Sequence, residues 1–375
     1  MTDGGGTRDA DVVVVGAGPV GLAAAVHARA AGLEVLIVDR RTGTLDKACG
    51  EGLLPGALRA VQALGADPPG HPLTGISYRA PGRHADHRFA AGPGRGVRRT
   101  ALHEALGERA DAVGAPLVYG RVTALRQDAA GVEVEVVPGS RAGETGGARA
   151  PVTLRAGWVL GCDGLHSAVR RLAGLDAGTG RSGGRPVRNR YGLRRHYEVA
   201  PWSDLVEVHW SPHAEAYVTP VAAGVVGVAL LGPRARSGAA SGAGFDALLR
   251  TQFPELSARL ATATSAGRLL GAGPLRRRSR RRTAGRVRLV GDASGYVDAL
   301  TGEGVRVGLA QADAAVRHLG DPDAYERAWR TVTRDYRTLT TGLLAWAASP
   351  ARRAIVPAAA RAPWLYGAVV ERLAR

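Results

Sequence analysis

The chain has 375 residues and a formal net charge of +17, because 50 lysines and arginines stand against 33 aspartates and glutamates. Hydrophobic residues make up 45% of it, which is enough for a packed core and excludes an intrinsically disordered protein. No apolar run of about 18 residues occurs, and the N-terminus lacks the pattern of a signal peptide. The two cysteines provide neither a disulfide framework nor a metal site. We therefore expect a soluble, cytoplasmic protein without a metal or an integral membrane segment.

Glycine is unusually frequent, with 53 residues, so about one GxGxxG sequence is expected by chance. Two occur, at 16–21 and 178–183, and the second is interpreted as accidental because no apolar run precedes it. The first follows the β-branched run 12–15 and begins an alanine-rich helix, after which a second apolar strand leads to Asp39. This order predicts a dinucleotide-binding βαβ unit, in which glycines and a helix N-terminus accept a pyrophosphate and Asp39 bonds a ribose hydroxyl.

Two later segments combine a strand with a glycine-containing turn. Residues 158–164 read WVLGCDG and precede a predicted helix. Residues 286–290 form the other strand, which is followed by GDASG at 291–295 and by TGEG at 301–304, where the next helix begins. A carboxylate at a strand end opposite a helix N-terminus suits a polyol chain, and the helix dipole can stabilise a reduced flavin ring. The three segments together indicate FAD as the dinucleotide.

These motifs are similar to those of the FAD-dependent oxidoreductases of the aromatic-hydroxylase fold, which include flavin monooxygenases and geranylgeranyl reductases. The matching segments are GAGPVG at 16–21, RRTALHEAL at 98–106, CDGLHSAVR at 162–170 and GDASGYVDALTGEG at 291–304. The loop KACGEGL at 47–53 resembles the reductase and tailoring-enzyme branch, in which this loop lies beside the flavin ring. The WxWxIP motif of tryptophan-type halogenases does not occur, which argues against chlorination.

The resemblance implies an FAD site made of the fingerprint turn, a strand-end carboxylate, an arginine on a helix and the two later motifs. The cofactor-binding residues expected from it are Gly16, Gly18, Pro19, Val20, Gly21, Asp39, Arg40, Cys49, Gly50, Arg99, Val122, Asp163, Asp292, Gly302, Gly304 and Val305. Asp39 and Arg40 are expected at the adenosine, the backbone of Val122 at the adenine, and Asp292 at the ribityl chain. No second glycine fingerprint follows a predicted strand, so the sequence offers no separate site for a second dinucleotide. NAD(P)H is therefore expected to bind only transiently as the electron donor, and another electron source is the alternative.

The fold class implied is α/β, with a Rossmann-like FAD-binding domain and β-meander, a mixed-sheet substrate domain and C-terminal helices. The expected boundaries are 1–72, 96–175 and 277–320 for the discontinuous FAD domain, 73–95 and 176–276 for the substrate domain, and 321–375 for the helices. Alternating residues predict meander strands and a substrate sheet that roofs the pocket. The predicted strands lie at 122–126, 132–136, 191–199, 204–210, 214–220 and 224–231. The glycine-rich segment 138–149 is predicted to be a mobile loop.

Candidate catalytic residues come from the KACGEGL loop and from the substrate-domain strands. They are Lys47, Arg194, His196, His213 and Tyr217. Arg194 and His196 share one face of an alternating strand, and a histidine there can deprotonate a phenol, although a structural histidine is the alternative. Lys47 is the only lysine of an arginine-rich chain and is interpreted as a compact charge near the flavin ring or substrate.

Three other groups have more than one interpretation. Cys49 is either redox-active, even linked to the flavin, or a small buried loop residue. Glu51 and Glu303 are either acids at the ring edge or helix caps. The arginine run 276–282 is either a solvated surface or a docking site for an acidic carrier protein or anionic substrate. Nucleic-acid binding is not expected, because no stacking aromatic residues interrupt the basic run.

The sequence therefore predicts an FAD-dependent monooxygenase of bacterial secondary metabolism that acts as a monomer or dimer. It is expected to hydroxylate or epoxidise an aromatic or polycyclic small molecule with NAD(P)H and O2, through a flavin C4a-hydroperoxide. One alternative is an oxygen-independent reductase of isoprenoid C=C bonds, which the KACGEGL loop favours. The other is a flavin-binding protein without turnover.

Overall fold

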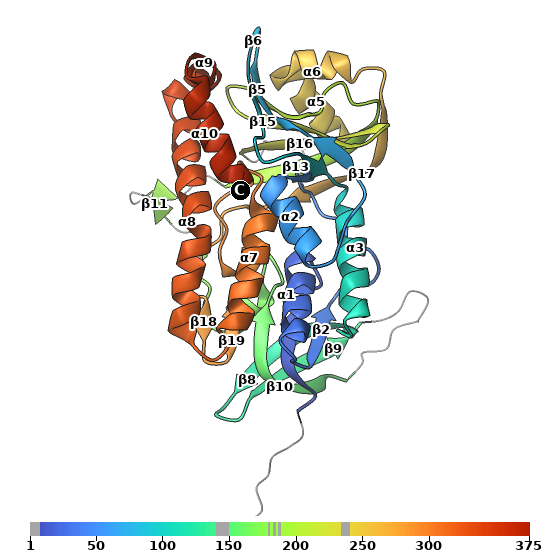
Figure 1. Cartoon of the computed structure of the whole chain (residues 1–375), viewed down its shortest axis with the longest axis vertical. Coiled ribbons are helices and arrows are strands. Elements are labelled where there is room, and N and C mark those ends of the chain that lie inside the picture. Colours follow the sequence, from blue (N-terminus) through green and yellow to red (C-terminus); the bar gives the residue numbers. More distant parts are fainter. Residues whose placement is uncertain (1–7, 140–149, 179–180, 183–184, 187–188, 234–240) are drawn as a thin grey trace, which may run out of the picture.

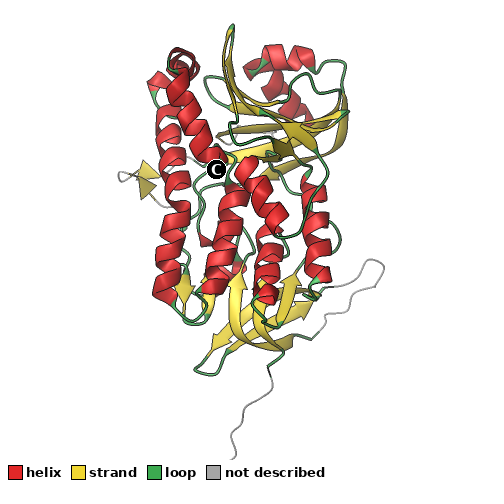
Figure 2. Ribbon diagram, viewed as in Figure 1, coloured by secondary structure: helices red, strands yellow, loops and turns green. Residues whose placement is uncertain are grey.

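The computed structural model describes residues 8–139, 150–178, 181–182, 185–186, 189–233 and 241–375. In these residues a layer of helices separates two seven-stranded sheets, one at the bottom and one at the top of Figures 1 and 2. The glycine-rich segment 140–149 and residues 179–180 and 183 of the second GxGxxG sequence lie outside the described part of the chain. None of the described helices is both long and apolar enough to span a bilayer.

The lower sheet carries the predicted βαβ unit, in which α1 (Pro19–Ala30) connects the first two strands. The strands are β1 (Ala10–Val15), β2 (Val35–Asp39), β8 (Leu117–Gln127), β9 (Val132–Pro138), β10 (Val152–Gly161), β18 (Thr283–Ala284) and β19 (Val287–Leu289). Five of them run parallel in the order β8–β2–β1–β10–β19, and β18 pairs antiparallel with β19. The apolar run of β1 is buried because helices cover Val12 and Val14 on one face of the sheet and the meander covers Val13 and Val15 on the other.

Two strands of this sheet have a double role. β8 is parallel to β2 over its first residues and antiparallel to β9 over the rest, while the first half of β10 also pairs antiparallel with β9. The result is a three-stranded β-meander that continues from the parallel sheet. The predicted Rossmann-like fold with a β-meander is therefore confirmed.

Helices cover one face of the parallel sheet. They are α1, α2 (Pro55–Ala63), α3 (Arg99–Ala112) and α7 (Gly304–Arg317). Small residues allow α1 and α7 to approach closely, since a Cβ at Gly308 would overlap the side chain of Val20. The short helix α4 (Ala168–Leu172) follows β10, and the 3-10 turn η1 (Gly291–Ser294) follows β19. Both chain segments that leave these strands therefore contain the turns identified in the sequence.

The upper sheet corresponds to the expected substrate domain, whose exact boundaries stay a prediction. Its order is β17 (Thr264–Ala272), β13 (Arg190–Glu198), β16 (Val225–Pro233), β15 (Glu215–Ala222), β14 (Leu205–Trp210), β5 (Gly75–Ala80) and β6 (Arg83–Arg88). All neighbours are antiparallel except β14 and β5. Helices α5 (Gly242–Gln252) and α6 (Pro254–Arg259) cover its outer face, and its inner face points toward the lower half of the molecule (Figure 1).

The remaining elements connect the two halves. A small sheet of β3 (Gly52–Leu53), β7 (Gly94–Gly96) and β4 (His71–Leu73) packs against β15, and β11 (Arg181–Ser182) pairs with β12 (Arg185–Pro186). The C-terminal helices are α8 (Pro322–Ala347), the 3-10 turn η2 (Pro350–Ala354), α9 (Ile355–Arg361) and α10 (Pro363–Ala374). α10 closes the β5 end of the inner face, where the Tyr366 ring lies 4.9 Å from that of Tyr78. The opposite end of the inner face, at β13, lies against the KACGEGL loop at 47–53.

Candidate functional site

The three glycines of the fingerprint turn differ in what surrounds them. A Cβ at Gly16 would lie 2.6 Å from the carbonyl oxygen of Cys162, and one at Gly21 would overlap the carbonyl oxygen of Gly16. At Gly18 the nearest atom would be Nη2 of Arg99, at 3.9 Å. Packing within the protein thus requires Gly16 and Gly21, whereas Gly18 leaves open space at the N-terminus of α1. That space and the unpaired N–H groups beside it fit a pyrophosphate.

Arg99 completes this phosphate site. It is the first residue of α3, only 8% of it is exposed, and its Nη1 has no hydrogen-bond partner among the described residues. Burial lowers the pKa of the Arg99 guanidinium, which is the expected effect of removing a cation from water. Buried cations normally have an anionic partner, and the open space at Gly18 lies directly beside this one. The residues present therefore fit the diphosphate of FAD.

Asp39 lies at the end of β2, as predicted. Its Oδ2 accepts a hydrogen bond from the Ala17 N–H at 2.8 Å, and its Oδ1 accepts one from the Arg41 N–H at 2.9 Å. The carboxylate therefore fixes the fingerprint turn and keeps lone pairs for a ribose hydroxyl. Arg40 is exposed, and it is the neighbouring Arg41 whose Nε contacts Asp39, at 3.3 Å. Val122 is buried in the meander, and its place at an adenine stays a prediction.

The CDG motif has a structural function in this chain. Oδ2 of Asp163 accepts hydrogen bonds from the N–H groups of Ala168 and Val169, so it caps α4, while its buried Oδ1 has no partner within the described chain. Arg170 follows on α4 and donates to the carbonyl oxygen of Ala293 at 2.9 Å. This bond joins the CDG motif to the GDASG motif. Direct contact of Asp163 with FAD stays a prediction.

The GDASG turn is held by residues that the sequence analysis missed. Oε1 of Gln311 accepts hydrogen bonds from the Gly291 N–H and the Ser294 hydroxyl, both at 2.8 Å, and Nε1 of Trp329 donates to the Ser294 Oγ. Asp292 keeps a quarter-exposed side chain, as a residue that contacts a polyol requires. Gly304, the first residue of α7, is also open, because a Cβ there would contact only the Tyr296 ring, at 3.7 Å.

The KACGEGL loop lies between these motifs. Nζ of Lys47 is 3.4 Å from the Asp292 carboxylate, and a Cβ at Gly164 would lie 4.0 Å from the same nitrogen. The Gly50 carbonyl oxygen accepts a hydrogen bond at 2.8 Å from Thr219 of the upper sheet. Burial raises the pKa of the Cys49 thiol, so this cysteine stays protonated at neutral pH and is a weak nucleophile. The loop therefore links the FAD motifs to the upper sheet through its backbone and through Lys47.

A buried chain of charged groups runs from this loop into the upper sheet. Oε1 of Glu51 accepts the Arg99 N–H at 2.9 Å, and its Oε2 is 2.7 Å from Nε2 of His196. Nδ1 of His196 is 2.9 Å from Nη1 of Arg194, whose Nη2 bonds Asp46. The predicted common face of Arg194 and His196 is confirmed, since both are 2% exposed and point to this loop. Asp46 was missed because nothing in its local sequence marks it.

The other two catalytic candidates have different surroundings. Tyr217 is buried on the inner face, and its hydroxyl donates to the Leu300 carbonyl oxygen at 2.6 Å. Burial raises the pKa of this phenol well above its usual value, so it stays neutral and acts as a donor. His213 needs a correction, because it is exposed in the turn between β14 and β15 and contacts none of the groups of the buried chain. The structure thus brings together Lys47, Arg194 and His196, with Tyr217 farther along the inner face.

A second buried network joins the inner face to the GDASGYVDAL segment. Arg190 contacts Glu215 at 2.6 Å and Asp298 at 3.0 Å, and Arg352 of η2 contacts the other oxygen of Glu215 at 2.6 Å. Burial raises the pKa of Asp298, although Arg190 opposes this effect. No local sequence pattern marks this network, because its members come from four distant segments.

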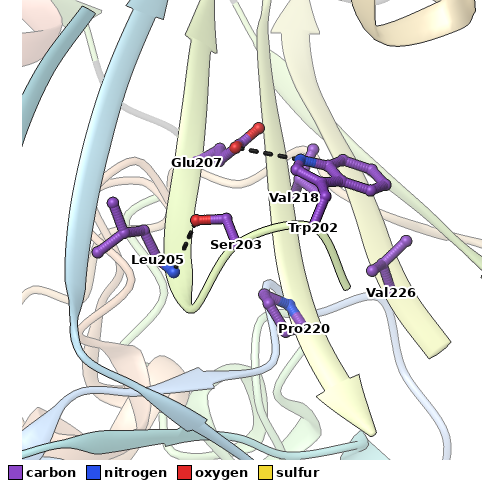
Figure 3. Close-up of a pocket in the computed structure, with 7 residues that line it drawn as sticks. All are labelled: Trp202, Ser203, Leu205, Glu207, Val218, Pro220 and Val226. Atoms are coloured by element: carbon purple, nitrogen blue, oxygen red, sulfur yellow. Dashed lines mark hydrogen bonds between the residues drawn. The ribbon is translucent and has the colours of Figure 1, made fainter. Parts of the chain in front are cut away.

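The outer face of the upper sheet contains a shallow hollow, which Figure 3 shows. Nε1 of Trp202 donates to Glu207 at 3.1 Å, as the figure shows, and His209 and Arg79 lie 2.9 Å and 3.0 Å from the same carboxylate. Its neighbour Val218 packs toward α5 and α6, away from the loop. The Glu207 carboxylate is therefore fully partnered, and the hollow is remote from the FAD motifs.

Part of the arginine run is structural. Arg282 bonds Glu326 of α8, Arg281 contacts Asp323 at 3.1 Å, and Arg277 lies 3.0 Å from His166. These contacts anchor the segment that returns from the upper sheet to β18. The prediction of a wholly solvated surface is therefore too simple, although Arg281 itself is 58% exposed on its side chain.

Comparison with known proteins agrees with this geometry. The sequence matches the family described as "FAD binding domain" over residues 9–322. The chain belongs to this FAD-binding family. The match includes all three motif segments, and with the fit at Gly18 and Arg99 it makes FAD the cofactor.

Two hydroxylating enzymes are among the similar curated proteins. The chain is 34% identical to the 3-(3-hydroxy-phenyl)propionate/3-hydroxycinnamic acid hydroxylase of Mycobacterium avium (strain 104) over 182 residues, which are 45% of this chain and 31% of that protein. It is also 34% identical to the 12-dehydrotetracycline 5-monooxygenase/anhydrotetracycline 6-monooxygenase of Streptomyces rimosus over 180 residues, or 44% of this chain and 33% of that protein. The aligned part is thus about a third of each relative's length.

A shorter match at higher identity is to a reductase. The chain is 57% identical to the menaquinone reductase of Mycolicibacterium smegmatis over 56 residues, which are 15% of this chain and 14% of that protein. Among solved structures, the anhydrotetracycline hydroxylase of Streptomyces rimosus superposes with a TM-score of 0.71 at 22% identity, covering 98% of this chain and 76% of that one. A flavin-dependent brominase superposes with a TM-score of 0.75 at 16% identity, covering 97% and 93%. Likeness at these identities shows the shared fold.

Proposed function

We propose that this protein is an FAD-dependent monooxygenase that hydroxylates or epoxidises an aromatic or polycyclic small molecule in bacterial secondary metabolism. The observation that carries the proposal is a row of side chains on the inner face of the upper sheet. Strand register places Arg194, Ala229, Tyr217, Val208 and Tyr78 side by side across five strands. The row is mostly apolar and aromatic with a cation at one end, a composition that suits a flat substrate with a polar edge, and α10 covers its Tyr78 end.

This row meets the FAD motifs at two points. Arg194 bonds Asp46 beside the KACGEGL loop, and Tyr217 bonds the Leu300 carbonyl in the last motif. A substrate on the row would therefore lie next to the segments expected around the flavin ring. The named activities of the two hydroxylating relatives support this substrate class.

The roles of the chain's own residues follow from their positions. Bound FAD supplies the redox chemistry with O2. Arg99 and the N-terminus of α1 would bind its diphosphate, and Asp292 with Lys47 would hold its polyol chain. The upper sheet would exclude water from the reacting groups. NAD(P)H would supply electrons by transient binding, and the protein would work in the cytoplasm.

A second candidate function has its own support. The menaquinone reductase match and the KACGEGL loop favour a reductase of isoprenoid-type C=C bonds. The loop contributes Lys47 and an open Gly50 to the region of the FAD motifs, so it can influence a hydride transfer as well as an oxygen reaction.

An acidic carrier protein that presents the substrate is a further proposal, for which the exposed part of the arginine run is the candidate surface.

The experiment that tests the proposal uses the holoenzyme with NADPH, isotopically labelled dioxygen and a panel of polycyclic phenols. The expected result is substrate-stimulated NADPH oxidation and a product that contains one labelled oxygen atom. In a parallel anaerobic assay of the same holoenzyme with NADPH and a menaquinone, reduction of an isoprenoid C=C bond would contradict the proposal and favour the second candidate. Tight FAD binding without turnover of either substrate class would favour a non-catalytic flavoprotein.

A further inference from the structure

We propose that Arg194, His196 and Glu51 form a positioning chain through which the upper sheet holds Arg99 and the KACGEGL loop in place for FAD. In this chain His196 is a neutral hydrogen-bond bridge and not a base that takes a proton from the substrate. The inference rests on FAD binding, which is common to both candidate functions, and not on the reaction that follows.

The direction of each hydrogen bond follows from the chemistry of its donor. An arginine guanidinium can only donate, so Nδ1 of His196 must accept the 2.9 Å bond from Arg194 and carries no proton. In a neutral imidazole the other nitrogen then carries the hydrogen, so Nε2 donates to the Glu51 carboxylate at 2.7 Å. Both ring nitrogens of this buried histidine are therefore occupied. A substrate proton has no free nitrogen to reach.

Glu51 has an unusual backbone conformation, which its buried side chain helps to hold. Its φ is +59°, in the left-handed region that a residue with a Cβ rarely adopts, and glycines stand on both sides of it. Its carboxylate binds the Arg99 N–H and His196, and it lies 3.8 Å from Arg194. These interactions of the buried carboxylate stabilise a turn that glycine would form without strain.

The upper sheet leaves room for this carboxylate. Gly227 on β16 is opposite His196, and a Cβ there would lie 2.8 Å from Oε2 of Glu51 and 3.6 Å from Cδ2 of His196. Gly232 on the same strand has only ordinary surroundings, since a Cβ there would lie 3.5 Å from its nearest atoms. Gly227 is thus needed for the chain itself, and Gly232 offers a matched control.

The chain ends at the FAD site. Glu51 holds the N–H of Arg99, the first residue of α3, and the guanidinium of the same residue lies beside Gly18 with one nitrogen unpaired. A shift of Glu51 would therefore move the helix start that aims Arg99. FAD affinity is expected to depend on residues of the upper sheet that do not contact FAD.

The first test compares His196→Gln with His196→Ala. Glutamine keeps a donor and an acceptor at the end of its side chain but cannot take up a proton, whereas alanine removes both hydrogen bonds. The apoproteins are titrated with FAD, and the visible circular dichroism of the bound flavin is recorded. We expect His196→Gln to keep FAD affinity and the flavin signal close to wild type, and His196→Ala to weaken binding about tenfold.

Two results would overturn the proposal. One is unchanged FAD affinity in His196→Ala. The other is a His196→Gln variant that binds FAD normally but loses one ionisation from its pH–rate profile, which would make His196 a base. Because the titration needs no substrate, its failure is distinct from a failure of the proposed reaction.

A second pair of variants keeps the proposal testable if His196→Ala does not fold. Gly227→Ala places a methyl group against the Glu51 carboxylate, and Gly232→Ala adds the same group elsewhere on β16. We expect Gly227→Ala to weaken FAD binding several-fold and Gly232→Ala to leave it unchanged. Equal FAD affinities in the two variants would contradict a link between the upper sheet and the cofactor.

Discussion

The two halves of the site use different parts of the polypeptide. In the lower sheet the cofactor is expected to meet backbone groups at a turn where Gly16 and Gly21 allow close packing and Gly18 leaves space. In the upper sheet the candidate site groups are side chains such as Arg194 and His196, held on one face by strand pairing. A site made of backbone groups requires particular residue types at a fixed spacing in the sequence. A site made of side chains requires only that residues distant in the sequence lie close together in the fold. The halves therefore respond differently to substitution.

The largest effect is expected for Gly21→Ala in the lower half. The added Cβ would overlap the Gly16 carbonyl oxygen, which belongs to the same turn and cannot move away freely. We expect a loss of more than about 4 kcal/mol of stability, or failure to accumulate folded protein. Thermal denaturation of the apoprotein measures it. A stable Gly21→Ala apoprotein would show that the lower half does not depend on close backbone packing at this turn.

Glu303 offers a contrast with the fully partnered Glu51. It is 2% exposed, its Oε1 has no partner in the described part of the chain, and burial raises its pKa to about 7 although Arg306 opposes this. Because this pKa lies above the unfolded value of 4.5, the folded protein binds more protons between pH 4.5 and pH 7, and stability falls as the pH rises through this range.

The variant Glu303→Gln cannot ionise and should not show this loss. Its stability relative to wild type is expected to increase by about 3 kcal/mol between pH 4 and pH 8, most of it before pH 7. Urea denaturation of both proteins across this pH range is the measurement. A stability difference that does not change with pH would show that folding leaves the pKa of Glu303 at its unfolded value.

Arg99 tests the cofactor side of the comparison. Removal of its guanidinium in Arg99→Ala should weaken FAD binding by about 1.5–3 kcal/mol, or roughly 10- to 150-fold, because a buried charged hydrogen bond to the diphosphate is lost. Arg99→Lys should retain part of the affinity, since a lysine supplies charge without the planar fork. Fluorescence titration with FAD compares the three proteins. Unchanged affinity in Arg99→Ala would place the diphosphate elsewhere.

The smallest effect is expected on the surface beside β18, where α8 begins. Arg281 pairs with Asp323, and both side chains are more than half exposed. Arg281→Ala should therefore cost less than about 1 kcal/mol and leave turnover of a free small substrate intact. Thermal denaturation and steady-state kinetics check this. A large loss of turnover would mean that the arginine run contributes to catalysis.

The sequence predicts the lower half well because each step of the βαβ unit restricts the residue that can stand there. Gly21 must be small, and Asp39 must follow a buried strand to reach Ala17. The strand positions of the upper half are also predictable, since the alternation at Arg194 and His196 marks a buried face. The contacts between these strands are not predictable from the sequence. β5, from an early segment of the chain, pairs with β14, and β17, from a late segment, pairs with β13.

The same reason explains which groups were missed. Asp46 is 148 residues from Arg194 in the sequence. Gly227 lies close to Glu51 only because β16 pairs with β13. No local sequence pattern predicts these contacts. His213 shows the opposite error, since a polar residue near a strand end resembles a site residue until the turn is seen to be exposed. A site made of side chains can therefore be predicted only when the strand register is known. A site made of backbone groups can be predicted from a sequence motif and the elements that flank it.

The most direct test of the account is an FAD titration of apoprotein from the wild type and from Gly18→Ala, together with the thermal stability of both. The open space at Gly18 predicts that the variant folds as stably as wild type and fails to bind FAD, while wild type binds one FAD per chain. A wild-type protein that binds no FAD, or a Gly18→Ala variant that binds it equally well, would contradict the central claim.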